Sequence, residues 1–398
     1  MGGKVIAPML TPTKPNRQQN FLEAIWSSIA WGSLDRLTAL AKHIFIASAI
    51  GLTPELDAFY MANGFITLFV TSWSHIADVI AVPKLVELIK LGKEREVRTM
   101  SGELFAFSCL FSLLITVLLS VGWPVICQLA WGFDEHRRQL LLDAVFWSGP
   151  LILLTIPVSM LYSFAKARRA FSLRYRNDFI TSAVILACVM LYPEATGVLL
   201  WSFSLGTIIS FLIALAESRG NSKLWGNPFS TNVTQLLPLA PALLVFYAIE
   251  HAYSLTNHQF VSFLPQGAVS AIAYAWTLSK LPPSLMRIES AFMTFYAEGT
   301  QALGNRSLIT NSLISSGIFV GAGLSLIMWE FSNPFITLVL EHGKFNRADT
   351  ELVAQCTGYF GLAMIPFLLM PALGQICQVE RQMKILMRRT LFGLLINI

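Results

Sequence analysis

The chain has 398 residues, of which 55% are hydrophobic and only 13% are charged, with a formal net charge of +5. Soluble domains carry about 25% charged residues, and so few charges could not solvate a water-exposed surface. The composition therefore excludes a soluble catalytic domain and predicts an all-α, polytopic membrane protein.

Apolar stretches follow one another along almost the whole chain. A spanning helix needs roughly 20 apolar residues to cross about 30 Å of hydrocarbon. The eleventh stretch is still apolar at Ile398, so we expect the chain to end inside a helix that a longer relative would continue. The fifth is short. We predict spans near 22–50, 58–82, 103–130, 140–165, 179–193, 196–217, 235–260, 267–297, 310–337, 351–378 and 384–398.

Lysine and arginine are distributed unevenly over the loops between these spans. With the N-terminus in the cytoplasm, the tail and the inner loops hold 20 basic residues and the outer loops hold four. Basic residues accumulate on the cytoplasmic side of membrane proteins. The pattern predicts a multi-pass protein of the cell inner (cytoplasmic) membrane, and it explains the positive charge without a nucleic-acid partner.

The predicted organisation is a tail, two membrane lobes and a linker. The cytoplasmic tail, 1–21, contains no short apolar core with a cleavage site, so we expect no removable signal peptide. Residues 22–217 form the N-terminal lobe with helices one to six. A cytoplasmic linker, 218–234, leads to an incomplete C-terminal lobe, 235–398, with helices seven to eleven.

A weak internal repeat relates the two lobes. Gly132 and Gly149 lie in a segment that resembles the one containing Gly343 and Gly361. An even number of helices in each repeat predicts parallel repeats, as in some transporters. Chance similarity between apolar helices is the alternative.

Four basic residues fall inside predicted spans: Arg36 and Lys42 in the first, Lys280 and Arg287 in the eighth. Each costs at least about 2.5–3.5 kcal/mol at a helix centre, so such residues usually face a cavity or a partner. We predict that all four line one cationic cleft and bind an anionic headgroup. The alternative is that they reach the membrane interface with their charged ends.

Intramembrane carboxylates and histidines form a second candidate set for ion coupling: Glu250, His251 and Asp78. Burial raises a carboxyl pKa and histidine titrates near neutrality, so Glu250 and His251 could take up protons. A structural pair held by hydrogen bonds between helices is the alternative reading.

Motifs for covalent, metal or nucleotide chemistry are absent from the sequence. There is no phosphate-binding glycine loop, no nucleophile elbow and no HExxH pair. The five cysteines lie in apolar stretches without metal-ligand or disulfide spacing. We therefore expect no catalytic residue, no metal, no cofactor and no nucleotide, and hence no enzyme.

Several stretches carry a resemblance to a known family. Gly51–Ala62 resembles a join of the type G-x-(x)-x-x-x-D-A-F-F-x-A between helices one and two. Phe263–Ala271 is similar to F-L-P-x-G-A-V-S-A, and Leu340–Phe345, followed by Asp349 and Thr350, is similar to L-F-x-R-G-x-F…D-T. In order and spacing these stretches resemble the lipid II flippase family (MurJ/MviN) of the multidrug/oligosaccharidyl-lipid/polysaccharide exporter superfamily.

The resemblance implies a two-lobed transporter that moves a lipid-linked glycan precursor, a polyisoprenoid diphosphate like lipid II, by alternating access among membrane lipids. Arg36 and Lys42 fall on the family's two arginines in the first helix. The chain departs from the family at Trp276–Leu278, where the family has D-R-L, and at Thr67–Thr71, where an arginine is missing. A proton- or sodium-coupled small-molecule exporter and a non-transporting scaffold of the same fold are the alternatives.

Asp57 is expected to have a structural role. It follows Pro54 and begins an apolar run, which is the position of an N-cap. We predict that it caps or pins the outer join between the first two helices and does not bind substrate.

The topology can be tested by labelling single cysteines in intact cells with a membrane-impermeant reagent. Cysteines placed in the loops at 84–98 and 166–176 should remain unlabelled, because the basic residues hold these loops inside. A cysteine at Lys344, in a predicted outer loop, should react and serves as the positive control. Labelling at either basic loop would contradict the predicted orientation.

Overall fold

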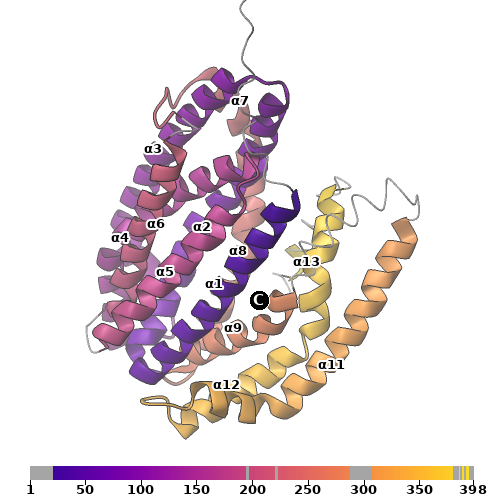
Figure 1. Ribbon diagram of the computed structural model, residues 1–398. Helices are drawn as coiled ribbons and strands as arrows, with labels where there is room; N and C mark the ends of the chain where they lie inside the picture. The colour runs from indigo at the N-terminus through magenta and orange to yellow at the C-terminus, as the bar shows by residue number, and fades with distance from the viewer. Residues whose placement is uncertain are drawn as a thin grey trace, which may run out of the picture.

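The computed structural model describes residues 21–193, 197–219, 223–286 and 306–379, with a few positions beyond residue 379. Every regular element within these residues is a helix (Figure 1). The helices are α1 (Phe21–Ile50), α2 (Pro54–Lys90), α3 (Glu94–Cys127), α4 (Glu135–Ala167), α5 (Ser172–Leu191), α6 (Val198–Ser218), α7 (Thr231–Leu236) with the short η1 (Leu237–Leu239), α8 (Ala240–Val261), α9 (Ala268–Met286), α11 (Arg306–Leu340), α12 (Arg347–Gly361) and α13 (Met364–Val379).

The helices agree with the first ten predicted spans. Eight of these spans overlap one described helix each, the seventh overlaps α7, η1 and α8, and the tenth overlaps the pair α12 and α13. Many helices run past the predicted limits because apolar length marks only the part that crosses hydrocarbon. By length and composition alone, α2, α3, α4, α6 and α11 could each cross a membrane. The pair α12 and α13, bent by 56°, adds a sixth candidate. More than half of the eleventh span falls outside the described residues, so the count of eleven stays a prediction.

Three helices begin with a polar cap at the same end of the molecule. Thr53 caps α2, Asp134 caps α4 and Asn346 caps α12, in each case through a side-chain oxygen that accepts a backbone N–H of the first turn. Such caps satisfy N–H groups that have no partner inside their own helix. The helix starts at this end are therefore set locally by the sequence.

The described helices pack in two groups. In the first group, α2, α3 and α6 contact α4, while α5 packs against α1 and α6. In the second group, α12 packs against α9 and α11, and α13 against α11 and α9. The helix pairs α2–α8, α2–α9 and α1–α9 join the first group to the second. In Figure 1, α11 and α13 stand to one side of the first group, and α12 crosses below them.

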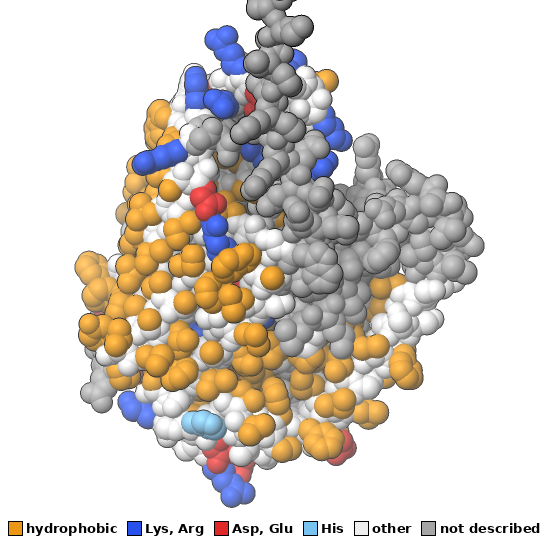
Figure 2. All heavy atoms as spheres, viewed as in Figure 1, with side chains coloured by type: hydrophobic (Ala, Val, Ile, Leu, Met, Phe, Trp, Pro, Cys, Tyr) orange, Lys and Arg blue, Asp and Glu red, His pale blue; other side chains and the backbone are white. Residues whose placement is uncertain are grey.

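Much of the exposed surface is apolar, as expected for a protein in contact with lipid. Large apolar side chains cover the outside of α3 and α11, for example Val121 at 76% exposed and Phe319 at 82% exposed. Figure 2 shows hydrophobic side chains over the middle of the visible face, with lysine and arginine gathered mainly at the end drawn uppermost. Patches of this kind are unusual on soluble monomers, whereas hydrocarbon solvates them.

Candidate functional site

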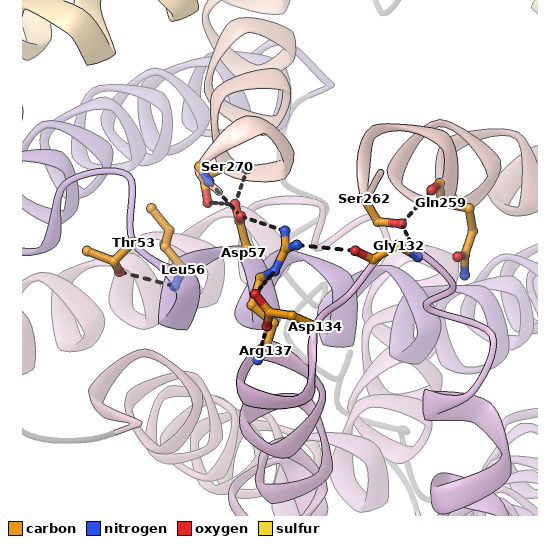
Figure 3. Close-up of polar contacts among 10 residues, drawn as sticks. Thr53, Leu56, Asp57, Gly132, Asp134, Arg137, Gln259, Ser262 and Ser270 are labelled. Carbon is orange, nitrogen blue, oxygen red and sulfur yellow. Dashed lines mark hydrogen bonds and ion pairs between the residues drawn. The ribbon is translucent and has the colours of Figure 1, made fainter. Parts of the chain in front are cut away.

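The carboxylate of Asp57 joins α2 to the start of α9. Asp57 is fully buried, and its Oδ2 accepts a hydrogen bond from the backbone N–H of Gly267 at 2.7 Å. Its Oδ1 accepts the backbone N–H of Ser270 at 2.8 Å and the hydroxyl of Ser270 at 2.6 Å (Figure 3). The N–H groups of a first helical turn lack partners, and the helix dipole favours an anion there. Asp57 therefore caps a helix that begins 210 residues later in the sequence.

The prediction that Asp57 caps or pins the join between the first two helices is wrong about the cap of α2. The cap of α2 is Thr53, whose Oγ1 accepts the N–H of Leu56 at 3.4 Å. Asp57 is the fourth residue of α2, beyond the capping position, and its side chain projects sideways to α9. The local pattern located a cap at this join but assigned it to the wrong residue, because Asp57 serves a helix that is distant in sequence.

A buried arginine of α4 stands beside this carboxylate. Arg137 is 7% exposed, and its Nη1 lies 3.8 Å from Oδ2 of Asp57. Its Nη2 donates to the carbonyl of Gly132 at 3.2 Å, and its Nε lies 3.5 Å from Oδ2 of Asp134. Outside the membrane span, the backbone N–H of Arg137 holds the pKa of the Asp134 carboxyl below its usual value. In the sequence, Arg137 is one of the four basic residues of the predicted outer loops, and no pattern there indicates that it is buried.

Two further contacts join the helix groups at the same end. The N–H of Gly132 donates to the hydroxyl of Ser262 at 3.1 Å, and the N–H of Lys344 donates to the carbonyl of Ser48 at 2.8 Å. The sequence repeat pairs Gly132 with Gly343, and each glycine approaches the end of a helix in the other group. A Cβ on Gly132 would overlap the backbone of Ser262, and one on Gly343 would overlap that of Ser48.

We call these three sets of contacts, made by Asp57, by Gly132 and by Lys344, the seal. Next to it, the rings of Tyr60 and Tyr274 meet edge to face with centroids 6.0 Å apart. Tyr274 also contacts the ring of Phe345 at 6.1 Å, and its ring is fully buried. The seal and this aromatic layer join the two groups at the end where α1 ends and α2 begins.

Beyond the aromatic layer lies a cavity of about 230 Å³, with both polar and apolar walls, between α2, α8, α9 and α12. It begins at Tyr60, and its walls carry amide, hydroxyl and imidazole groups together with aromatic rings. Its lining residues are Tyr60, Asn63, Gly64, Thr67, His251, Asn257, His258, Ile272, Ala273, Trp276, Thr277 and Phe360. A cavity between two helix groups that are joined at one end can hold a polar ligand and be exposed by relative movement of the groups.

Arg36 and Lys42 lie on the side of α1 that packs against α5. The side chain of Arg36 is 44% exposed, and its Nε is 4.0 Å from Oδ2 of Asp35. Lys42 is buried with its Nζ 5.1 Å from the ring centroid of Phe203, and Asp35 and Asp178 interact with it electrostatically. Neither residue lines the 230 Å³ cavity.

Lys280 lies on α9 next to α13. Its Nζ sits 3.8 Å above the ring of Trp276, which lines the cavity, and 5.9 Å from the ring of Phe367. Arg287 lies outside the described residues. The structure thus places Arg36 and Lys42 away from the cavity and Lys280 beside it, while the cationic cleft shared by all four stays a prediction.

The three candidates for ion coupling have different surroundings. His251 lines the cavity. Asp78 accepts a hydrogen bond from Ser163 at 2.6 Å and one from Lys166 at 3.1 Å, so it is engaged inside the first helix group. The side chain of Glu250 lies outside the described part of the chain.

The fold is also that of solved membrane transporters. A solved structure described as "Lipid II flippase MurJ, inward closed conformation" superposes with a TM-score of 0.74 at 17% identity, covering 90% of this chain and 75% of that one. An inward-facing multidrug transporter of the MATE family superposes with a TM-score of 0.72 at 10% identity, covering 93% and 88%.

The sequence comparisons give the family. The model of the lipid II flippase MurJ family matches residues 46–398, and the chain belongs to this family. A probable lipid II flippase of Buchnera aphidicola (Acyrthosiphon pisum strain) is 24% identical over 394 residues, which cover 95% of this chain and 77% of the relative. A probable lipid II flippase of Rhizobium tropici is 24% identical over 384 residues, covering 91% and 71%. The family predicted from the motifs is therefore confirmed.

Replacing Asp57 by asparagine should weaken the seal, although asparagine is as good a cap as aspartate in general. Asparagine has one carbonyl oxygen, so it cannot accept from both Gly267 and Ser270, and it loses the charge that faces Arg137. A buried N–H left without a partner costs roughly 1–3 kcal/mol. A cysteine at Asn63, in a chain without its native cysteines, should then react faster with an impermeant thiol reagent applied from the sealed end.

The matched control is Asp349→Asn, which changes a half-buried carboxylate at the same end that caps only its own helix. It should leave the labelling rate unchanged. Equal labelling in Asp57→Asn and the unaltered chain would show that the seal does not depend on this carboxylate.

Alanine at Gly132 or at Gly343 should also open the seal. The added methyl group overlaps backbone atoms of the other helix group, and at Gly343 the positive φ of 61° is unfavourable for alanine as well. Faster labelling of the cysteine at Asn63, with normal protein levels, is the expected result. Gly122→Ala is the control, since nothing lies within 4 Å of the added carbon. A seal that tolerates alanine at both positions would contradict the close approach.

Proposed function

We propose that this chain carries a lipid-linked glycan precursor, a polyisoprenoid diphosphate of the lipid II type, across the cytoplasmic membrane by alternating access. Membership of the lipid II flippase family over residues 46–398 is the observation that carries the proposal. The cavity next to a seal at one end supports the mechanism. The substrate leaves chemically unchanged, so the chain acts as a transporter and not as an enzyme.

The cations inside the membrane are proposed to hold the diphosphate. Charge-assisted hydrogen bonds to phosphate are stronger than neutral ones, and arginine binds phosphate oxygens through two N–H groups at once. Arg36 has an exposed guanidinium, and Lys280 stands beside the cavity. Lys42 is buried on the same helix as Arg36, and Arg287 completes the proposed set from outside the described residues.

The proposed orientation has the N-terminus in the cytoplasm, which places the seal on the outer face. The excess of basic residues in the loops at the opposite end supports it. In this state the cavity receives substrate from the cytoplasmic side, and breaking the seal releases it outward. An ion gradient or the membrane potential supplies the direction, with Glu250 and His251 as the proposed coupling residues.

Asp78 is a weaker candidate for coupling, because Ser163 and Lys166 already bind its carboxylate away from the cavity. A proton- or sodium-coupled small-molecule exporter would need an acidic residue deep in one lobe, and the same observation leaves Glu250 as the predicted candidate for that role. Among the described residues that line the cavity, none is aspartate or glutamate.

The proposal is tested by following the arrival of lipid-linked glycan at the outer face in cells depleted of the native protein and supplied with variants. The unaltered chain should restore translocation. Arg36→Ala should reduce it roughly tenfold or more, since a hydrogen bond to a charged group is worth about 1.5–3 kcal/mol. Arg36→Lys keeps the charge but cannot bind phosphate oxygens through two N–H groups at once, so it should retain part of the activity.

Arg95→Ala, which removes an exposed basic residue from the first turn of α3, is the control and should be as active as the unaltered chain. Absence of translocation by the unaltered chain, at normal membrane levels, would favour a non-transporting scaffold. Full activity of Arg36→Ala would show that Arg36 has no part in substrate binding.

A further inference from the structure

A cluster of charged side chains lies inside the first helix group, where α1 packs against α5. The rings of Trp31 on α1 and Phe179 on α5 contact each other with centroids 5.8 Å apart, and this contact aligns the two helices. Asp35 is one turn beyond Trp31, and Asp178 precedes Phe179 in the chain. Lys42, seven residues after Asp35, lies on the same face of α1. The packing therefore brings two carboxylates and an ammonium group within electrostatic reach of one another.

The ammonium group of Lys42 is buried without a close partner. Lys42 is 9% exposed, and within the described residues its Nζ makes no hydrogen bond and no ion pair. It lies 5.1 Å from the ring centroid of Phe203, and Asp35 and Asp178 act on it electrostatically. A buried cation is stable only where negative charge compensates it, so the surroundings of Lys42 favour an additional anion.

The two carboxylates make loose contacts with arginines. Oδ2 of Asp35 lies 4.0 Å from Nε of Arg36, and Oδ2 of Asp178 lies 3.8 Å from Nε of Arg174, one turn earlier on α5. Both distances are longer than a hydrogen bond. The side chain of Arg36 is half-exposed, so an anion that approaches it has to displace only a loose contact.

Positive charge exceeds negative charge in this cluster. The titratable side chains that face Asp178 are Arg174 on its own helix, Asp35, Arg36 and Lys42 on α1, and Tyr162 on α4. On α6, Glu217 is engaged with Arg176. Three cations thus stand against two carboxylates and favour their ionised forms, whereas partial burial favours their neutral forms. The protonation of the two carboxylates therefore depends on the charge around them.

An anion bound to Arg36 and Lys42 changes this balance. It cancels the positive charge that stabilises the two carboxylates, and it adds like charge next to them. Their neutral forms are then favoured, so a proton is taken up. Asp178 is half-exposed and lies six residues into α5, about 9 Å from the end of the helix that follows the basic loop at 166–176. Water on the predicted cytoplasmic side can supply this proton.

We propose that Asp35 and Asp178 form a proton-binding site, which takes up a proton from the cytoplasmic side when a diphosphate headgroup binds to Arg36 and Lys42. The proton bonds to a carboxylate oxygen, and no other covalent bond changes. It lowers the net charge of the loaded site, which reduces the cost of closing that site away from water. The inference rests on the proposed function and adds to it a site separate from Glu250 and His251 of α8.

The test counts the protons that are taken up when a probe binds to the purified full chain in lipid nanodiscs. The probe is a short-chain polyprenyl diphosphate esterified to one N-acetylated hexosamine, because its two phosphates do not titrate near neutral pH. Titration calorimetry in buffers of different ionisation enthalpy gives the number of protons. The unaltered chain should take up roughly 0.5–1 proton per bound probe, and its affinity should rise by up to about tenfold per unit as the pH falls.

Asp35→Asn and Asp178→Asn should each reduce the proton uptake, and the double variant should abolish it. Binding of the probe should be at least as tight in these variants, because the anion no longer competes with a carboxylate for the cations. Damage to the fold would weaken binding instead. The melting temperature shows whether each variant folds, and the single variants decide the question if the double variant does not.

Glu351→Gln is the matched control. Glu351 also stands one turn after an arginine, with Oε1 3.5 Å from Nε of Arg347, but it belongs to α12 in the second helix group. This variant should take up as many protons as the unaltered chain.

The outcomes separate the two proposals. Binding of the probe without proton uptake by the unaltered chain overturns the proton site, while headgroup binding stands. Uptake that persists in the double variant assigns the proton to Lys42 or to another group and overturns the role of the two carboxylates. Failure of the unaltered chain to bind the probe contradicts the proposed function itself.

Discussion

The arrangement of the two helix groups depends on one buried carboxylate at the start of a helix. Asp57 gives both of its oxygens to the first turn of α9, and the N–H groups and dipole of that turn stabilise its charge. Without this anion, α9 would begin in a buried place with unsatisfied N–H groups. Without α9, Asp57 would be a buried charge facing only Arg137. The N–H groups of α9 stabilise the buried carboxylate, and the carboxylate gives these N–H groups their hydrogen-bond partner.

A polar contact of this kind suits an interface between helix groups that has to separate. The groups of the seal are polar, so water can replace their partners when the helix groups separate, and the net cost of each exchange is modest. Apolar packing at the same place would lose area with no such replacement. The bare backbone at Gly132 and Gly343 allows the second pair of contacts to form at close range without side chains that would have to interlock.

The charged side chains and the uncharged polar side chains inside the membrane lie in different places. Arg36 and Lys42 belong to α1, and Lys280 reaches the cavity only through the ring of Trp276. The cavity itself holds neutral hydrogen-bonding groups. The family pattern places an aspartate and an arginine where this chain has Trp276 and Thr277, so the substitutions change a charged stretch of α9 into an uncharged wall beside one lysine.

The sequence by itself determined the membrane class, the family and the approximate place of ten helices, because apolar length and helix caps are local properties of the chain. It also picked out Asp57 and the repeat containing Gly132 and Gly343. Only the tertiary structure decided that Asp57 caps α9, that Arg137 is buried beside it, and that His258 and Trp276 face one cavity. These facts depend on contacts between residues up to about 210 positions apart, and no local pattern of hydrophobicity or charge encodes which distant helix a side chain will meet.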